Sequence, residues 1–237
     1  MARTIFQTRL KEINSLTPLV RELVVEFQEP PQMDFQAGQF VMLHVPDPGS
    51  EKPILRAYSL ASDDKIKTQF KLIIKLFGEG RASQFIKELK GGENLQFTGP
   101  FGKLLFKQPP AEQVLFLCTG AGLSQHMSFL LSHGEKYPNT RFHLLVGVWN
   151  ESEMFYEKEM AGIKIKDFKY EFVLDKPADS WKGKRGFVTN YLDQFDYNRI
   201  DTQIYLCGNP VMIKGAKEHL IDKNKFSGDR IFAESFG

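Results

Sequence analysis

Three glycine-containing segments of the 237-residue chain carry residue types that bind phosphate groups. Residues 118–124 (CTGAGLS) follow an apolar run and open a helical pattern, so a phosphate could approach the backbone and meet free N–H groups. Residues 207–210 (CGNP) form a similar turn, with proline in the first helical turn. Residues 78–83 (GEGRAS) add the cation of Arg81 at a helix start. Each of the first two, taken alone, also fits a plain strand–helix connection.

The segment around Ser124 permits a second chemistry. Residues 122–126 (GLSQH) resemble the strand–turn–helix elbow of a nucleophilic serine, which His219 with Asp196 or Asp201 would complete. That elbow requires small residues on both sides of the serine, and here a bulky histidine stands where glycine is needed. A hydrolase is therefore the minor alternative.

Two different patterns of secondary structure must position these segments. The first hundred residues contain short β-branched and aromatic runs between turn signals, at residues 22–27, 39–45 and 70–77, which predicts an antiparallel barrel or sandwich. One helix is expected to start at Ser83 and to end at Gly91 and Gly92. The prolines within residues 107–113 mark a boundary between predicted domains 1–107 and 112–237.

From residue 114 onward, apolar strands alternate with amphipathic helices. We predict helices over 124–137, 152–163, 188–195 and 210–223, and strands over 114–118, 141–149, 170–175, 203–208 and 230–236. This alternation is typical of a parallel sheet with helices on both faces. In such sheets ligands bind at the carboxyl ends of the strands, where two of the glycine segments lie.

Composition argues against several other classes of protein. The net charge is +2 and the lysines are scattered, so no nucleic-acid surface is expected. Cys118 and Cys207 both follow apolar runs, and without a CxxC pair or Cys/His cluster we expect neither a disulfide framework nor a metal site. No apolar run reaches the ~18 residues of a membrane helix, so we expect a cytoplasmic protein without membrane contact.

Five motifs, in this order and across nearly the whole chain, resemble the ferredoxin–NADP reductase family: residues 56–59 (RAYS), 80–83 (GRAS), 99–102 (GPFG), 120–124 (GAGLS) and 207–210 (CGNP). The resemblance implies an N-terminal antiparallel Greek-key β-barrel that binds FAD and a Rossmann-like doubly wound parallel sheet that binds NADP or NAD. It further implies FAD-dependent electron transfer between NAD(P)H and a one-electron acceptor protein: ferredoxin, flavodoxin or an oxygenase component.

The resemblance assigns roles in the flavin-binding half. Arg56 would pair with the FAD pyrophosphate, Tyr58 would lie against the flavin ring, and Ser59 would hydrogen-bond near flavin N5. The helix start would hold the pyrophosphate through backbone groups and through the hydroxyl of Ser83. The implied FAD residues are Arg56, Ala57, Tyr58, Ser59, Gly80, Arg81, Ala82 and Ser83.

In the second half, Cys207 would lie beside the nicotinamide C4 atom, and the E-x-F pattern of Glu234 and Phe236 would place an aromatic ring on the other flavin face. The implied catalytic residues are Ser59, Cys207 and Glu234. The family usually carries proline where this chain has Gln125, and Gly237 follows the expected terminal aromatic. The implied dinucleotide residues are Thr119, Gly120, Ala121, Gly122, Cys207 and Gly208.

The choice between NADPH and NADH stays open at this stage. Lys176, Lys184 and Arg185 could bind a 2′-phosphate, whereas Asp175 could accept a ribose hydroxyl and repel that phosphate. Two alternative functions also remain: a free-flavin or cytochrome reductase, and a non-catalytic electron-transfer subunit of a complex. We expect a monomer.

Overall fold

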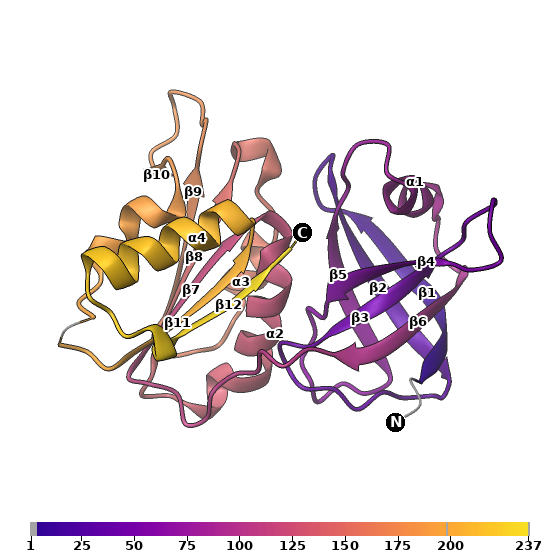
Figure 1. The fold of residues 1–237 in the computed structure, drawn as a ribbon, viewed down its shortest axis with the longest axis horizontal. Coiled ribbons are helices and arrows are strands. Elements are labelled where there is room, and N and C mark those ends of the chain that lie inside the picture. The colour runs from indigo at the N-terminus through magenta and orange to yellow at the C-terminus, as the bar shows by residue number, and fades with distance from the viewer. Residues whose placement is uncertain (1–3, 198, 237) are drawn as a thin grey trace.

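The computed structural model describes residues 4–197 and 199–236, which form two sheets that lie side by side (Figure 1). The first hundred residues build a six-stranded antiparallel sheet, and the residues after the linker build a six-stranded parallel sheet. The predicted fold class is confirmed. The first sheet ends at Phe101 and the second begins at Gln113, so the predicted boundary between residues 107 and 112 falls in the connecting segment.

The antiparallel sheet curls into a barrel with strand order β4-β3-β6-β1-β2-β5. A bridge between Leu60, just after β4, and Leu72 of β5 joins its two edges. The core is formed by alternate side chains, such as Phe6 and Leu10 on the first strand. The strands are β1 (Ile5–Ser15), β2 (Val20–Glu29), β3 (Phe40–Val45), β4 (Ile54–Ser59), β5 (Gln69–Lys75) and β6 (Asn94–Phe101).

The helix α1 (Arg81–Glu88) separates β5 from β6. It begins two residues earlier than predicted, with Gly80 as its N-cap, and it ends at a Leu89 C-cap before the two glycines expected to stop it. Ser83 was predicted to cap the helix, and this is wrong. Its hydroxyl instead accepts a hydrogen bond from Phe77 N at 2.8 Å and donates to Phe77 O at 3.1 Å, so it holds the preceding turn together.

The parallel sheet has the order β10-β9-β8-β7-β11-β12. The chain starts in the middle at β7, adds strands on one side, and then crosses to β11 on the other side. The carboxyl ends of β7 and β11 therefore flank the point where the winding direction reverses. The strands are β7 (Gln113–Thr119), β8 (Arg141–Val148), β9 (Phe168–Leu174), β10 (Lys184–Arg185), β11 (Thr202–Gly208) and β12 (Ile231–Ser235).

Helices cover both faces of this sheet. One face packs against α2 (Leu123–His133) and α3 (Glu157–Ala161), and the other against α4 (Pro210–Glu218) and the 3₁₀ segment Val188–Gln194. Because both faces are covered, β7 is an almost continuous apolar run, with Phe116 on the α2 side and its neighbours on the α4 side.

Two of the predicted helices differ from the prediction in their type of helix. The segment 152–163 is split into a 3₁₀ turn (Glu151–Glu153) and the short α3, because Tyr156 between them has a left-handed φ of 64°, which a right-handed helix cannot contain. The segment 188–195 is a 3₁₀ helix. Apolar spacing cannot separate the two helix types, since both place residues three to four apart on one face.

Two other helices are shorter than predicted. Helix α2 ends at His133 and continues as a 3₁₀ turn (Gly134–Lys136). Helix α4 ends at Glu218 and continues as a π-helical turn (His219–Lys223). A last 3₁₀ turn (Gly228–Arg230) precedes β12.

Helix α2 also joins the two halves of the molecule. Nearly all of its side chains are buried, because it lies between the parallel sheet and the barrel (Figure 1). Two of its serines bond to the barrel half: Ser128 Oγ donates to Ser62 O at 2.7 Å, and Ser132 Oγ accepts from Asp64 N at 2.9 Å. Ser124 Oγ lies 3.4 Å from Ile73 O of the barrel.

The segment between β8 and α3 makes a second set of contacts with the barrel. The Tyr156 hydroxyl donates a hydrogen bond to the carboxylate of Glu22, a buried residue of β2. Lys75 Nζ of β5 lies 3.0 Å from Glu153 Oε2. The relative placement of the two halves is therefore fixed by specific polar contacts.

Candidate functional site

Two turns at the carboxyl edge of the parallel sheet interlock. Thr119 Oγ1, at the end of β7, accepts a hydrogen bond from Asn209 N, just after β11, at 2.9 Å. A Cβ atom at Gly122 would lie 2.3 Å from Cys207 O, and one at Gly208 would lie 2.4 Å from Thr119 Oγ1. Gly208 also has a φ of +130°, which other residues rarely adopt. Glycine is therefore needed at both positions for the turns to meet.

The first of these turns presents backbone N–H groups. Gly120–Gly122 form a 3₁₀ turn directly before α2, and no side chain caps the start of either. Free N–H groups at a helix start are suited to an anionic oxygen. The structure thus brings the predicted dinucleotide residues Thr119, Gly120, Ala121 and Gly122 together with Cys207 and Gly208.

Cys207 and Glu234 are register partners on the neighbouring strands β11 and β12. Burial raises the pKa of the Cys207 thiol well above its usual value, and the nearby Cys118 and Glu234 raise it further. The thiol is therefore neutral at physiological pH. Burial also raises the pKa of the Glu234 carboxyl, while a hydrogen bond from the Gln125 amide opposes that rise.

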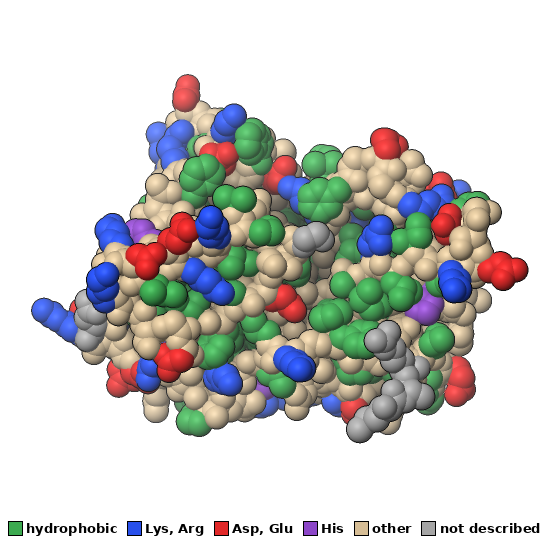
Figure 2. All heavy atoms as spheres, in the orientation of Figure 1, with side chains coloured by type: hydrophobic (Ala, Val, Ile, Leu, Met, Phe, Trp, Pro, Cys, Tyr) green, Lys and Arg blue, Asp and Glu red, His purple; other side chains and the backbone are tan. Residues whose placement is uncertain are grey.

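Phe236 is attached to the same edge, since its N–H donates to Gly208 O at 3.0 Å. The residue is 38% exposed, so its ring offers uncovered apolar surface. Figure 2 shows a hollow between the two halves, with hydrophobic side chains gathered on its barrel side. Gly237, which follows in the sequence, lies outside the described residues.

On the barrel side, the predicted residues Arg56, Ala57, Tyr58 and Ser59 lie on the edge strand β4. Arg56 is exposed, and its Nη1 donates to Leu55 O at 3.0 Å. Burial raises the pKa of Tyr58, and the charge of Arg56 opposes the rise, so the guanidinium acts on the tyrosine hydroxyl. Ser59 is buried. The strand therefore presents a cation and a half-buried aromatic ring together.

The start of α1 carries the remaining barrel-side residues. Gly80 is the N-cap, and no side chain caps the first turn, so backbone N–H groups in that turn lack partners within the helix. Arg81 Nε donates to Pro46 O at 3.0 Å, which attaches the helix to the end of β3. The hydroxyl of Ser83 is bonded to the Phe77 backbone. The first turn of α1 therefore leaves backbone N–H groups such as those of Ala82 and Ser83 without partners in the helix, while the Ser83 hydroxyl donates to Phe77 O.

Sequence reasoning missed Lys75. The lysine ends β5 of the barrel, and its Cδ atom lies 3.8 Å from where a Cβ atom of Gly120 would stand. The stem of Lys75 therefore lies beside the turn at Gly120, while its ammonium pairs with Glu153 Oε2 at 3.0 Å. A lysine at a strand end has no sequence signature, so only the packing of the two halves reveals it.

The residues predicted to select between NADPH and NADH have different surroundings in the structure. Lys176 lies with its Nζ 4.4 Å from the ring centre of Trp149 and lines a pocket of about 570 Å³. Arg185 Nη2 instead donates to the carbonyls of Ala178, Asp179 and Trp181 at 3.0–3.2 Å, so it braces a loop. The other residues lining the pocket are Asn150, Glu151, Ser152, Ala178 and Ser180.

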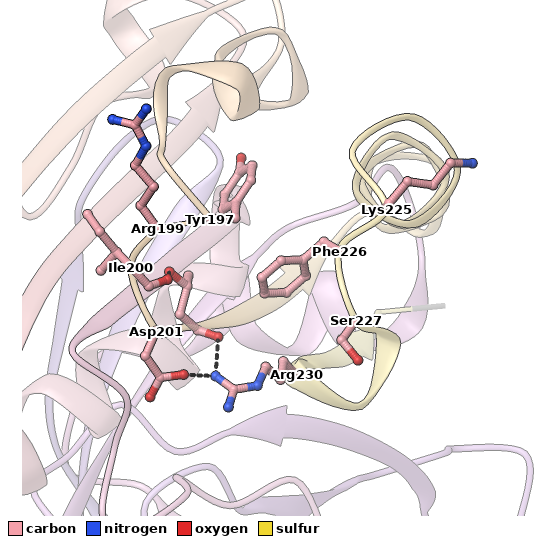
Figure 3. Close-up of a pocket in the computed structure, with 9 residues that line it drawn as sticks. Tyr197, Arg199, Ile200, Asp201, Lys225, Phe226, Ser227 and Arg230 are labelled. Atoms are coloured by element: carbon pink, nitrogen blue, oxygen red, sulfur yellow. Dashed lines mark hydrogen bonds and ion pairs between the residues drawn. The ribbon is translucent and has the colours of Figure 1, made fainter.

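A second pocket, of about 340 Å³, lies at the opposite, amino-terminal edge of the sheet (Figure 3). Arg230 reaches the carboxylate of Asp201 and the carbonyl of Thr202. Figure 3 shows Arg199 and Lys225 pointing away from the other lining residues. The pocket thus lacks a group of converging side chains that could bind a ligand.

The serine-elbow alternative is wrong. Ser124 is buried, and its hydroxyl donates to Ala121 O at 2.7 Å. The half-buried His219 bonds to Asp193 at 2.6 Å, not to either aspartate proposed for it. No serine, histidine and aspartate among these residues forms a triad.

Within residues 4–197 and 199–236, no cluster of three or more His, Cys, Asp or Glu side chains could hold a metal ion. No helix of that same part of the chain is both long and apolar enough to cross a bilayer.

Two family models match the chain, one to each half. Residues 7–106 match the oxidoreductase FAD-binding domain, and residues 116–218 match the oxidoreductase NAD-binding domain. These ranges coincide with the antiparallel barrel and with the parallel sheet up to α4.

Individual proteins are similar to the chain over most of its length. The chain is 32% identical to the reductase component of phenol 2-monooxygenase from Pseudomonas sp., covering 93% of this chain and 62% of that one. It is 29% identical to ferredoxin–NADP reductase B of Sorangium cellulosum, with 90% of each covered. A crystal structure of a ferredoxin NADP⁺ reductase from Neisseria gonorrhoeae with bound FAD and NADP superimposes with a TM-score of 0.84 at 21% identity, over 98% of both chains. The chain spans about three fifths of the length of the oxygenase components it matches.

Proposed function

Because the chain belongs to the ferredoxin–NADP reductase family, we propose that it uses FAD to transfer electrons between NAD(P)H and a one-electron acceptor protein. The observation that carries the proposal is the interlocked pair of turns after β7 and β11, with Cys207 and Glu234 beside them, at the edge that meets the barrel. Bound FAD would supply a ring that accepts two electrons from nicotinamide and releases them singly.

The residues on the barrel fit FAD. The uncapped start of α1 and the exposed guanidinium of Arg56 offer donors to a pyrophosphate. Tyr58 and the exposed ring of Phe236 offer apolar surfaces to the flat flavin, and Phe77 of the turn before α1 is 70% exposed. Exposed aromatic rings such as those of Phe77 and Phe236 are consistent with a ligand that covers them.

The residues on the parallel sheet fit a nicotinamide dinucleotide. The turn from Thr119 to Gly122 would hold its pyrophosphate through backbone N–H groups. Lys75 of the barrel lies nearby, with its ammonium paired with Glu153 at 3.0 Å. Lys176 and the pocket of about 570 Å³ would take the adenosine end. Of the cations considered for a 2′-phosphate, Arg185 is bound to three carbonyls and Lys184 pairs with Glu171 at 3.4 Å, which leaves Lys176 as the contact we propose.

The chain's own groups would orient the reacting atoms and exclude water. The neutral Cys207 thiol would pack beside nicotinamide C4 without adding charge, and Ser59 would donate to the flavin near N5. The half-buried Glu234 carboxyl would hold a proton, or release one, close to that place.

The nature of the acceptor is the part of the proposal that depends on the relatives. Two curated relatives are named as a reductase or electron transfer component of an oxygenase system, and one is a ferredoxin–NADP reductase. We propose ferredoxin, flavodoxin or an oxygenase component as partner, with the chain acting as a cytoplasmic monomer. Turnover of NADH and NADPH with cytochrome, free flavin, ferredoxin and flavodoxin as acceptors would separate this from the two alternative functions.

The FAD site is tested by reconstitution. We expect purified chain mixed with FAD to retain the flavin absorbance bands after gel filtration, and Arg56→Ala to weaken FAD affinity about 10- to 100-fold because it removes a charge-assisted contact. Lys87→Ala, at the far end of α1, is the matched control and should bind FAD as the original chain does. If Arg56→Ala binds FAD as tightly as Lys87→Ala does, Arg56 lacks the proposed role. If the chain mixed with FAD shows no flavin bands, the proposed function is wrong.

A further inference from the structure

Gln125 lies in the first turn of α2 and is completely buried. Its Nε2 atom lies 2.5 Å from Glu234 Oε2 on β12 and 3.2 Å from Gly38 O in the barrel half. One amide group therefore connects three parts of the molecule that are far apart in the sequence. Neither family motifs nor apolar patterning assign it any role.

The orientation of this amide is fixed by its partners. Gly38 has a φ of +98°, and a Cβ atom there would lie 2.3 Å from Leu104 O and 2.7 Å from the Phe129 ring, so its carbonyl is held close to α2. A carbonyl can only accept, so the nitrogen of the Gln125 amide must face it, and the second N–H of that nitrogen faces Glu234. The Oε1 atom is left buried without a partner, which is the cost of this arrangement.

We propose that Gln125 is a positioning residue for hydride transfer: its amide holds the Glu234 carboxyl against the barrel half, beside Cys207. This inference rests on the proposed function for its catalytic meaning. It adds to that function a residue that sets both the place and the proton affinity of the carboxyl. An N–H donor stabilises the ionised carboxylate, whereas burial stabilises the protonated acid.

Few other charges act on this carboxyl. From β11 the neighbouring titratable group is the Cys207 thiol, which burial keeps neutral. On α4 the charged pair Lys214 and Glu218 is exposed and separated by 3.8 Å. Near the same strand, Lys107 Nζ lies 5.6 Å from the centre of the Phe232 ring. The Gln125 amide makes a direct contact with the Glu234 carboxylate.

The test is the titration of Glu234 in the FAD-loaded full chain without dinucleotide. The side-chain carboxyl carbon is followed by NMR on ¹³C-labelled glutamate, and its signal is assigned by its loss in Glu234→Gln. We expect Gln125→Met, which keeps the length of the side chain but removes the donor, to raise the pKa of Glu234 by about one unit, a tenfold change in proton affinity. The pH profile of flavin reduction should move in the same direction.

Ser128→Ala is the matched control, because it removes a different hydrogen bond between α2 and the barrel, to Ser62 O at 2.7 Å. It should leave the pKa of Glu234 unchanged. If methionine at 125 prevents folding, Gln125→Glu places a second carboxyl against Glu234, and the pair should hold its last proton to a higher pH than Glu234 does in the original chain. An unchanged pKa of Glu234 in a folded Gln125 variant would overturn the proposal. The titration requires no turnover, so failure of hydride transfer alone would count against the proposed function instead.

Discussion

Burial sets the charge state of the reactive side chains at the carboxyl edge of the parallel sheet. The Cys207 thiol is held protonated, and the Glu234 carboxyl gains proton affinity, because both lie away from water. In the proposed function, a neutral thiol beside the nicotinamide would neither repel nor attract the hydride. Its contribution would then be geometric and should not vary across neutral pH.

Replacing Cys207 by alanine should accordingly slow hydride transfer more than it weakens FAD binding. We expect the rate of flavin reduction in stopped-flow mixing to fall about tenfold or more, because the nicotinamide loses a packing partner. FAD affinity should change little, since Cys207 lies on the parallel-sheet side. Cys118→Ala, its register partner on β7, is the control and should retain the rate. Equal losses in both variants would show a packing defect instead of a role for Cys207.

At the scale of elements, the turns after β7 and β11 depend on glycines that allow them to touch. We expect Gly122→Ala to reduce the free energy of unfolding by about 1–3 kcal/mol and to weaken dinucleotide binding, because its Cβ atom would collide with Cys207 O. Gly215→Ala in α4 is the contrasting variant, since no atom lies within 4 Å of its Cβ position. Alanine at position 215 should raise the free energy of unfolding by as much as about 1 kcal/mol. Urea unfolding of both variants checks the pair, and similar effects would contradict the close approach.

Sequence patterning predicts the alternating half of the fold well, because buried parallel strands are continuous apolar runs between clear turn signals. It indicated β2, β3 and β5 of the barrel but did not single out β1, β4 or β6 as strands. The motif at residues 56–59 lies on an edge strand whose side chains are mostly exposed, so it lacks a clear apolar alternation. The left-handed φ of Tyr156, whose hydroxyl bonds to Glu22 of the barrel, has no signal in the apolar pattern.

The candidate site was predicted in part. Glycine turns and the two cysteines can be read from the sequence because their positions follow apolar runs. Gln125 and Lys75 could not be found that way, since each acquires its partners only when the barrel packs on α2 and on the turn at Gly120. The structural role of Arg185 was hidden for the same reason.

At the scale of the whole molecule, a buried carboxylate makes one of the contacts that hold the two halves together. Burial raises the pKa of Glu22, but hydrogen bonds from Tyr156 and Asn14 and the charge of Lys71 outweigh this and leave the pKa below its usual value. A carboxyl whose folded pKa is lowered stabilises the folded state above its unfolded pKa, and this stability is lost as the pH falls through the folded pKa. The contact between the halves should therefore weaken in acid.

Tyr156→Phe removes one of these donors and should lower the free energy of unfolding by about 1–3 kcal/mol at neutral pH. The loss should shrink as the pH falls through the lowered pKa of Glu22, because below that pKa the carboxyl is protonated in both proteins. Urea unfolding at a series of pH values measures this. Tyr170→Phe, whose hydroxyl donates to Glu157 O at 3.3 Å near the surface, is the control and should change stability little at any pH. A pH-independent loss in Tyr156→Phe would contradict the role of Glu22.

The central claim is that the two halves together pass a hydride from a nicotinamide dinucleotide to FAD. Anaerobic stopped-flow mixing of the FAD-loaded chain with NADH, and separately with NADPH, tests it most directly. We expect the oxidised-flavin absorbance band to bleach in a single turnover with at least one dinucleotide, at a rate that saturates with its concentration. A chain that binds FAD but whose flavin stays oxidised with both dinucleotides would contradict the account.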